Sequence, residues 1–246
     1  MTSQMIQTIT EDYYSRFCSI GLSNLKPGTY FVCSEARDEK LKGFGCKYPI
    51  YILANDVWCV AAYSPRYREW VEQQKLYGRD KMIAAISEKF KLKKKKLMLF
   101  EKEAVTRFGG AKVLSTAEYP LYESFFRKVS PGGNPSGWLY EYFTEKAAKG
   151  YFTGYLLSNK LVSVCDAPDM PYMEGQIQHT GISTLKEERR KGYAACTAAL
   201  AAHHLIEIGI CPQWECSAEN IASIMLAKSI GYKEYGDAYI FEEWDG

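Results

Sequence analysis

The segment at residues 189–194, which reads Arg-Arg-Lys-Gly-Tyr-Ala, lies between a predicted strand at 176–184 and a predicted long helix that ends near Ile208. Its small residues let the backbone approach a phosphate closely, and the first amide groups of a helix have no partner within the helix. The helix dipole and the basic side chains also favour an anion such as pyrophosphate. The alternative is an ordinary basic helix start with Gly192 in a turn. The segment therefore predicts an anion site where a strand meets a helix.

The predicted elements around this segment alternate between strands and helices. Strands are expected at 151–157, 161–165, 176–184 and 213–216, helices at 119–128, 138–149 and 220–230, and loops at 130–137 and 166–171. Two further strands, at 232–235 and 238–241, are expected to close the chain as a pair around Gly236 and Asp237. This alternation of strands and helices predicts an α/β fold.

The order of strand, basic loop, long helix, strand with Trp214 and helix beginning at Asn220 resembles the GNAT superfamily of acetyl-CoA-dependent N-acyltransferases. The resemblance covers residues 112–246, and its most specific part is 176–232. A closer resemblance is to the bacterial GNAT acetyltransferase family with an extra N-terminal α/β region. The stretches that carry it are Gly-Tyr-Phe-Thr-Gly at 150–154, Lys-Leu-Val-Ser-Val at 160–164 and Pro-Gln-Trp-Glu-Cys at 212–216.

The resemblance implies a division of the chain and a shape for its sheet. A GNAT N-acetyltransferase domain would occupy residues 112–246. An N-terminal α/β region at 1–111 would pack against it, on the side of the acceptor. The fold would be α/β with an α+β mixed sheet, and this sheet would splay open between the strand that ends at Thr184 and the strand of Trp214.

The resemblance also implies where acetyl-CoA, the acyl donor, would bind. It would lie in the splay, with its pantetheine arm bonded to the backbone of Ile182, Ser183 and Thr184 like an added strand. Asn220 would contact the same arm with Ser223 beside it, and the alternative for Asn220 is a plain helix cap. The pyrophosphate would be held by the basic loop and the helix start, at Arg189, Arg190, Lys191, Gly192, Tyr193 and Ala194. A primary amine would attack the acetyl group directly, and no metal is implied.

Two positions depart from the family pattern. Many GNAT enzymes carry a tyrosine seven residues after the helix asparagine, where this chain has Ala227. Several carry a glutamate on the central strand, where this chain has Gln178. Because an ammonium must lose a proton before it attacks a thioester, another base is needed. The candidates for proton transfer are Glu215, Glu174, His179 and, as a phenol, Tyr232, with Tyr235 and Tyr239 as further tyrosines. The alternative function is a CoA-binding regulatory protein or pseudo-enzyme without turnover.

The first hundred residues give weaker signals. A helix is expected at 12–18, a strand at 29–33, a hairpin of strands at 48–54 and 57–62, and helices from Ser64 and at 80–90. The lysine-rich run at 91–96 is interpreted as a helix end or a loop, and the alternative is a patch for an anionic partner such as nucleic acid.

Composition excludes several classes of protein. Lysine and arginine number 31 and aspartate and glutamate 29, so a net charge of +2 gives no global attraction to nucleic acid or to a membrane. Mean hydropathy is −0.28, and no apolar run approaches the ~18 residues of a membrane helix. The start of the chain has no pattern of a secretory signal. Its eight cysteines contain no C-x-x-C pair, so reduced thiols of a cytoplasmic protein are expected. A zinc site of His203, His204, Cys211 and Cys216 is disfavoured, because adjacent helical histidines point about 100° apart. The expected partner is a small-molecule or peptide amine, and a homodimer is left open.

Overall fold

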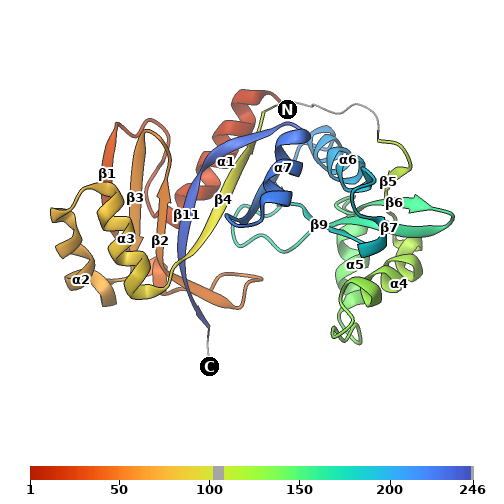
Figure 1. The fold of residues 1–246 in the computed structure, drawn as a ribbon, viewed down its shortest axis with the longest axis horizontal. Coiled ribbons are helices and arrows are strands. Elements are labelled where there is room, and N and C mark those ends of the chain that lie inside the picture. The colour runs from red at the N-terminus through yellow and green to blue at the C-terminus, as the bar shows by residue number, and fades with distance from the viewer. Residues whose placement is uncertain (102–107, 245–246) are drawn as a thin grey trace.

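The computed structural model describes residues 1–101 and 108–244. Within these residues the strands form two sheets (Figure 1), in the orders β1-β3-β2-β11-β4-β10-β8 and β5-β6-β7-β9. The larger sheet consists of β1 (Gly28–Cys33), β3 (Trp58–Tyr63), β2 (Cys46–Ala54), β11 (Tyr232–Trp244), β4 (Lys93–Phe100), β10 (Cys211–Ser217) and β8 (Ile177–His179). The smaller consists of β5 (Ala111–Val113), β6 (Thr153–Leu157), β7 (Lys160–Asp166) and β9 (Gly181–Thr184). The pairs β1–β3 and β8–β10 are parallel and the others antiparallel, so the predicted mixed α/β fold is confirmed.

Helices cover both faces of each sheet. On the larger sheet, α1 packs on one face, and α2 and α3 pack on the other. On the smaller sheet, α4 and α5 cover one face and α6 the other, while α7 lies beside β10 and β11. The bounds are α1 (Ser3–Cys18), α2 (Arg68–Gln73), α3 (Arg79–Phe90), α4 (Tyr119–Val129), α5 (Leu139–Ala148), α6 (Tyr193–Glu207) and α7 (Ile221–Ser229). Because α6 also contacts β10, it joins the two sheets.

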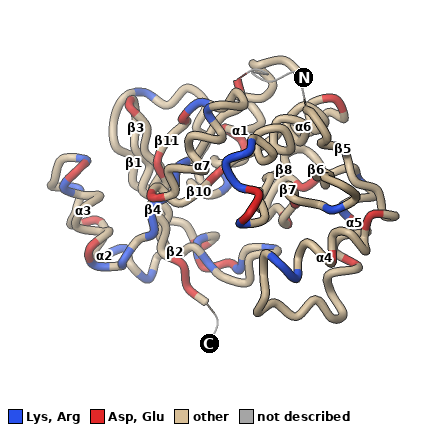
Figure 2. Tube along the Cα trace, turned by 45° about the vertical axis from the view of Figure 1, so that its right-hand side comes forward, with Lys and Arg blue, Asp and Glu red and all other residues tan. Residues whose placement is uncertain are grey.

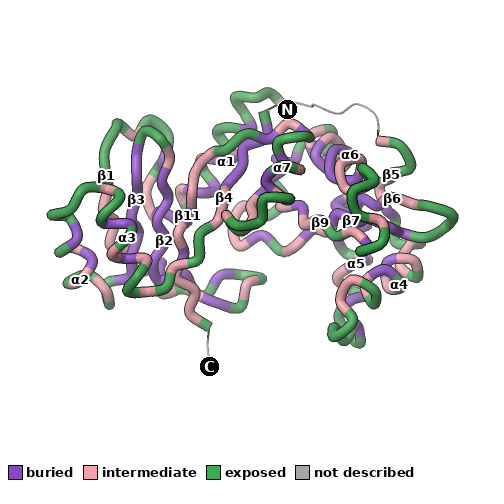
Figure 3. Tube along the Cα trace, in the orientation of Figure 1, coloured by how far each residue is buried: buried purple, intermediate pink, exposed green. Residues whose placement is uncertain are grey.

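Strand β2 is buried along almost its whole length, which explains its nearly continuous apolar sequence. Successive side chains point to opposite faces of a strand. Accordingly, Ile50 and Ile52 share a core cluster with Ile86 of α3, while the ring of Tyr51 stacks 5.0 Å from that of Phe17 in α1. Buried segments therefore follow the inner strands of the sheet in Figure 3.

One hydrophobic core is continuous across the boundary that the sequence places between residues 111 and 112. Strand β4, from the first hundred residues, lies between β11 and β10, which belong to the last forty. Its buried residues Met98 and Phe100 share one cluster with Phe17 of α1, Ala202 of α6 and Trp214 of β10. The N-terminal α/β region is therefore packed against the rest of the chain as predicted, and it is joined to it through a shared sheet.

The prediction for the lysine run is wrong, because β4 begins at Lys93. Cross-strand ion pairs account for the difference, since each lysine finds a carboxylate on β10 or β11 that local sequence does not reveal. The pairs are Lys93–Glu242 (2.6 Å), Lys94–Asp237 (2.9 Å), Lys95–Glu215 (2.7 Å), Lys96–Glu234 (2.9 Å) and Lys96–Asp237 (2.8 Å). These lysines are therefore paired within the fold, and basic and acidic segments are interspersed over the molecule in the view of Figure 2.

The expected closing pair of strands is also wrong, because β11 is a single strand from Tyr232 to Trp244. Gly236 lies at a shift in register between β11 and β4, the mark of a β-bulge rather than of a turn. A Cβ on Gly236 would lie 2.7 Å from the carbonyl oxygen of Ala54 on β2. The glycine is thus needed for close approach of two strands.

Helix α1 begins at Ser3, earlier than the expected helix at 12–18. The hydroxyl of Thr2 caps it by accepting a hydrogen bond from the amide of Met5 (3.2 Å). Its first turns bury few side chains, among them Ile6 and Thr10, so the apolar periodicity is weak there. Contacts with the sheet stabilise this part of the helix.

Candidate functional site

The predicted strand at 176–184 is divided between the two sheets. Its first part, β8, pairs with β10 in parallel, and its second part, β9, pairs with β7. Between them, the amide of Thr180 donates to the carbonyl oxygen of Gln213 on β10 (3.3 Å). Beyond that bond, β9 and β10 belong to different sheets. The predicted splay between the strand of Thr184 and the strand of Trp214 is thus confirmed.

The edge of β9 that faces the splay is open. The amide of Leu185 donates to Val162 of β7 (3.0 Å), whereas the amide of Thr180 points to β10. Because main-chain groups alternate in direction along a strand, the amides of Ile182 and Thr184 point to the open side. β9 is the last strand of its sheet, so these groups face the cavity rather than another strand of it.

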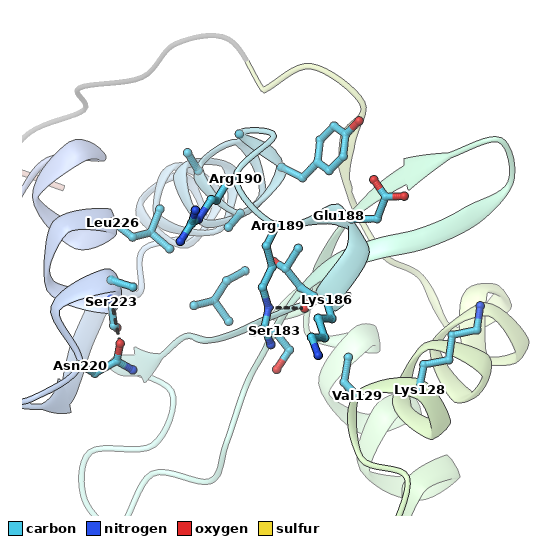
Figure 4. Close-up of a pocket in the computed structure, with 17 residues that line it drawn as sticks. Lys128, Val129, Ser183, Lys186, Glu188, Arg189, Arg190, Asn220, Ser223 and Leu226 are labelled. Carbon is cyan, nitrogen blue, oxygen red and sulfur yellow. Dashed lines mark hydrogen bonds between the residues drawn. The ribbon is translucent and has the colours of Figure 1, made fainter.

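A cavity of about 910 Å³ occupies the splay. It is bounded by β9, the loop after it, the first turn of α6 and one face of α7, with Lys128 and Val129 of α4 at its rim (Figure 4). Every predicted donor-site residue lines it except Lys191. Its size is in the range of clefts that hold cofactor-sized ligands. The structure thus brings together residues that lie about forty positions apart in sequence.

The first turn of α6 faces this cavity without a side-chain cap. Gly192 is the N-cap residue, with φ of +85°, and no side chain bonds the free amides of the turn. A Cβ at Gly192 would meet nothing within 4 Å, so the space in front of the helix is open. Such a helix start presents unpaired N–H groups and the positive end of the dipole, which suits an anion.

Two arginines flank this helix start. Arg189 reaches along β9, where its Nε donates to the carbonyl oxygen of Thr184 (3.3 Å), and Arg190 reaches toward α7 (Figure 4). Both line the cavity. Lys191 does not, and its ammonium pairs at 2.8 Å with Glu188, which does line the cavity.

On the far wall, Asn220 acts as the N-cap of α7, and its Oδ1 accepts a hydrogen bond from the amide of Ser223 (3.1 Å; Figure 4). The cap interpretation of Asn220 is thus correct, and the residue also lines the cavity. The hydroxyl of Ser223 accepts a hydrogen bond from the indole of Trp214 (3.1 Å). This bond ties α7 to β10 at the splay.

Glu215 and His179 lie on the two paired strands β10 and β8 at the closed end of the splay. Glu215 pairs with Lys95 at 2.7 Å, with about a fifth of each side chain exposed. Burial acts to raise the pKa of Glu215, but the ammonium of Lys95 and the ring of His179 outweigh it, so this pKa lies below its ordinary value. The Nδ1 of His179 lies 3.2 Å from the carbonyl oxygen of Gln213. Neither side chain lines the large cavity.

The other candidates for proton transfer lie elsewhere. Glu174 is on an exposed loop and pairs with Lys42 at 2.6 Å, and the hydrogen bond and charge of Lys42 hold the pKa of Glu174 below its usual range. Tyr232 is in the core, its ring 5.0 Å from that of Phe100 and 5.6 Å from that of Trp214. Burial raises the pKa of Tyr232 far above that of a free phenol. Neither residue lines the cavity in the splay.

The two departures from the family pattern have structural roles. Ala227 is fully buried, where α7 packs against the sheet. Gln178 is also buried, and its amide donates to the carbonyl oxygens of Pro168 (2.8 Å) and His179 (3.0 Å). Gln178 thus ties the loop after β7 to β8.

Sequence reasoning missed several residues of this region. Leu226 and Ala195 complete the walls of the cavity, and helix periodicity from Asn220 and Gly192 could have indicated them. Asp166, expected in a loop, is the last residue of β7 and lies opposite Gly181 of β9. No local signal reveals that placement, because it depends on strand register.

Comparison with known proteins agrees with this geometry. Residues 140–241 match the family model described as GNAT acetyltransferase. This part of the chain belongs to the GNAT acetyltransferase family. The resemblance drawn from the sequence, and with it the assignment to a family of N-acetyltransferases, is therefore confirmed.

Individual relatives extend the comparison. The uncharacterized N-acetyltransferase YdfB of Bacillus subtilis (strain 168) is 33% identical over 95 residues, which are 39% of this chain and 35% of that protein. The chain therefore matches about a third of the length of this curated relative. An acetyltransferase of the GNAT family from Colwellia psychrerythraea has a TM-score of 0.56 at 13% identity, covering 99% of this chain and 97% of that one. The second likeness shows that both share a fold over their whole length.

The described residues were searched for metal-binding clusters and for membrane-spanning helices. Across residues 1–101 and 108–244, no three His, Cys, Asp or Glu side chains gather into a group that could hold a metal ion. His203 and His204, considered for zinc, lie beside Glu207 at 3.1 Å and 3.8 Å. No described helix is long and apolar enough to cross a membrane.

Proposed function

We propose that the protein transfers the acetyl group of acetyl-CoA to a primary amine, by direct attack in a ternary complex. The observation that carries this proposal is the cavity in the splay, where the open edge of β9 meets the uncapped start of α6. The membership of residues 140–241 in the GNAT family supports it. Acetyl-CoA would supply a thioester whose acetyl carbon accepts the amine.

The residues of the cavity fit the two ends of such a donor. The outward amides of Ile182 and Thr184 suit the amide groups of a pantetheine arm, which would add to β9 as a strand. The amide of Asn220 would meet the same arm from α7. The free N–H groups of Tyr193 and Ala194, with Arg189 and Arg190, would hold the pyrophosphate. Lys191 contributes only a nearby positive charge, because it is paired with Glu188.

The transfer itself requires proton movements that residues near the splay would serve. The amine nitrogen forms a bond to the acetyl carbon, and the carbon–sulfur bond breaks. The CoA sulfur leaves with the electron pair and takes up a proton, which balances the proton that the nitrogen loses as the amide forms. The attacking ammonium must first lose a proton. We propose that His179 and Glu215, at the closed end of the splay, provide a path for that proton to solvent. The main contribution of the enzyme would be positioning.

The remaining expectations follow from this function. The acceptor would be a small-molecule or peptide amine, and the location the cytoplasm, where the free cysteines of this chain would stay reduced. Among the described residues, none in 1–101 or 108–111 lines the large cavity or the smaller one beside it. The role proposed for residues 1–111 on the acceptor side would therefore be indirect, through the sheet in which β4 holds β10 in place.

The test is a binding measurement followed by a transfer measurement. Calorimetry should show that acetyl-CoA and CoA bind the intact protein in a one-to-one ratio. With a panel of primary amines, acetylated product and CoA should then form in equal amounts. They are best quantified by mass spectrometry, because the free cysteines would react with a thiol reagent. Binding without turnover on any amine would favour a CoA-binding regulatory protein, and absence of binding would refute both functions.

A further inference from the structure

A second cavity, of about 170 Å³, lies between the smaller sheet and the helices α4 and α5. It adjoins the large cavity, because Val129 and Ser183 line both. Ser183 and Asp166 face the same side of this sheet, since Ser183 pairs with Val164 and Asp166 with Gly181 in the register of β7 and β9. The small cavity thus reaches β9 from the face opposite α6.

The walls of this small cavity are mainly aromatic. They are formed by Tyr122, Phe125, Phe126, Trp138 and Tyr142. An engineered cavity of about 150 Å³ is enough to hold benzene, so this one admits a single ring-sized group. Aromatic faces also attract cations.

Of the described residues that line this cavity, Asp166 alone is charged. It forms no ion pair with any residue in the described part of the chain, and its carboxylate lies directly against Gly181, where an added Cβ would overlap it. Burial raises the pKa of Asp166, against the opposing effects of His179 and of the amide of Gly181. A half-buried carboxylate without a cationic partner is costly for the fold, and a bound ammonium would neutralise it.

We propose that this aromatic cavity binds the amine-bearing end of the acceptor, with the ammonium against the carboxylate of Asp166. The assignment rests on the proposed function and names its substrate class. The acceptor is a primary amine with an apolar or aromatic body and no anionic group beside its nitrogen. An adjacent carboxylate would be repelled by Asp166, and a sugar would leave its hydroxyl groups against aromatic walls without partners.

The test compares phenethylamine with two other amines, each of which lacks one of the proposed features. Phenethylamine has the proposed features, phenylalanine adds a carboxylate beside the same amine, and glucosamine has a polar body. Phenethylamine should have a kcat/KM at least about tenfold above both, the scale of one charge-assisted hydrogen bond. Equal or better rates with phenylalanine or glucosamine would overturn the assignment.

Variants of Asp166 give the decisive measurement. Asp166→Asn keeps the shape of the side chain and removes its charge. This substitution should raise at least about tenfold both the KM for phenethylamine and the Kd of phenethylamine measured by calorimetry on CoA-loaded protein. The Kd of acetyl-CoA should stay within twofold of wild type. Asp56→Asn, on the exposed turn between β2 and β3, is the matched control and should change neither. Unchanged KM and Kd in Asp166→Asn would overturn the assignment.

Two further variants keep the test independent of folding and of turnover. Gly181→Ala retains the charge but displaces the carboxylate, so it should weaken phenethylamine as Asp166→Asn does. Trp138→Ala changes a residue that is 47% exposed, so it should fold and also bind phenethylamine more weakly. If acetyl-CoA binds but no amine is acetylated, the proposed function fails. Calorimetry of phenethylamine with wild type and Asp166→Asn then still decides whether the pocket binds amines.

Discussion

Placing one negative charge in the first turn of α6 should strongly weaken donor binding without harming the fold. In the substitution Ala194→Glu, the new carboxylate enters the wall of the large cavity beside the amides of the helix start. It would lie about 6 Å from an anion held there, where two unit charges repel by about 2.8 kcal/mol at an effective dielectric constant near 20. That energy corresponds to about a 100-fold rise in Kd. A pyrophosphate carries more than one charge, so the true loss should be larger.

The same substitution should leave stability unchanged or slightly raised. Glutamate in the first turn of a helix interacts favourably with the dipole by about 0.3–1 kcal/mol, and its helix propensity is close to that of alanine. The matched control is Ala84→Glu, at an exposed position of α3. Calorimetry with acetyl-CoA and thermal unfolding are measured on wild type and both variants. A folded Ala194→Glu protein that binds acetyl-CoA within threefold of wild type would refute the anion site at α6.

Three further predictions concern stability. Glu215→Gln should lower the free energy of unfolding at pH 7 by about 1–3 kcal/mol, because it leaves the half-buried ammonium of Lys95 without its partner. The pKa of Glu215 is lowered in the folded protein, so this stabilisation is present above the pKa of the unfolded state and is lost as the pH falls through the pKa of the folded state. Urea titrations in which Glu215→Gln loses the same free energy of unfolding at pH 7 and at strongly acid pH would contradict this. Asp166→Asn should raise the melting temperature at pH 7, because burial raises the pKa of Asp166 in the folded protein, so that its ionised form opposes folding. The gain in melting temperature should vanish below the pKa of the unfolded state, near 3.9. A gain that persists below that pH would rule out the charge of Asp166 as its cause. Gly236→Ala should destabilise the protein by about 1–3 kcal/mol, because its Cβ would meet the carbonyl oxygen of Ala54, and an unchanged urea midpoint would show that β11 shifts freely.

The elements that were predictable from sequence are those with strong local signals. Helix α6 follows a glycine and an alanine-rich apolar pattern, and α7 begins at an asparagine cap, so both were found near their observed bounds. The residues expected at the donor site, except Lys191, line one cavity, because most of them lie close to the helix starts that local signals reveal. Helix caps and apolar periodicity are therefore sufficient to predict both helices of the last sixty residues.

The features that were missed depend on partners distant in sequence. The lysines of β4 resemble a solvated helix end until their carboxylate partners on β10 and β11 are known. Gly236 next to Asp237 has the composition of a turn, and only the crowding by β2 identifies it as a bulge. Asp166 is indistinguishable from a loop aspartate until the register of β7 and β9 places it against Gly181.

The central position of β4 also has a consequence for synthesis of the chain. Its residues leave the ribosome more than a hundred residues before β10 and β11, so the strand must wait with both edges unpaired. Such an apolar strand is prone to aggregate, and lysines on exposed strand edges oppose edge-to-edge association. During that interval Lys93 to Lys96 lack their carboxylates and keep the nascent strand positively charged. The same four residues that later close the sheet through ion pairs would thus act first as its protection from aggregation.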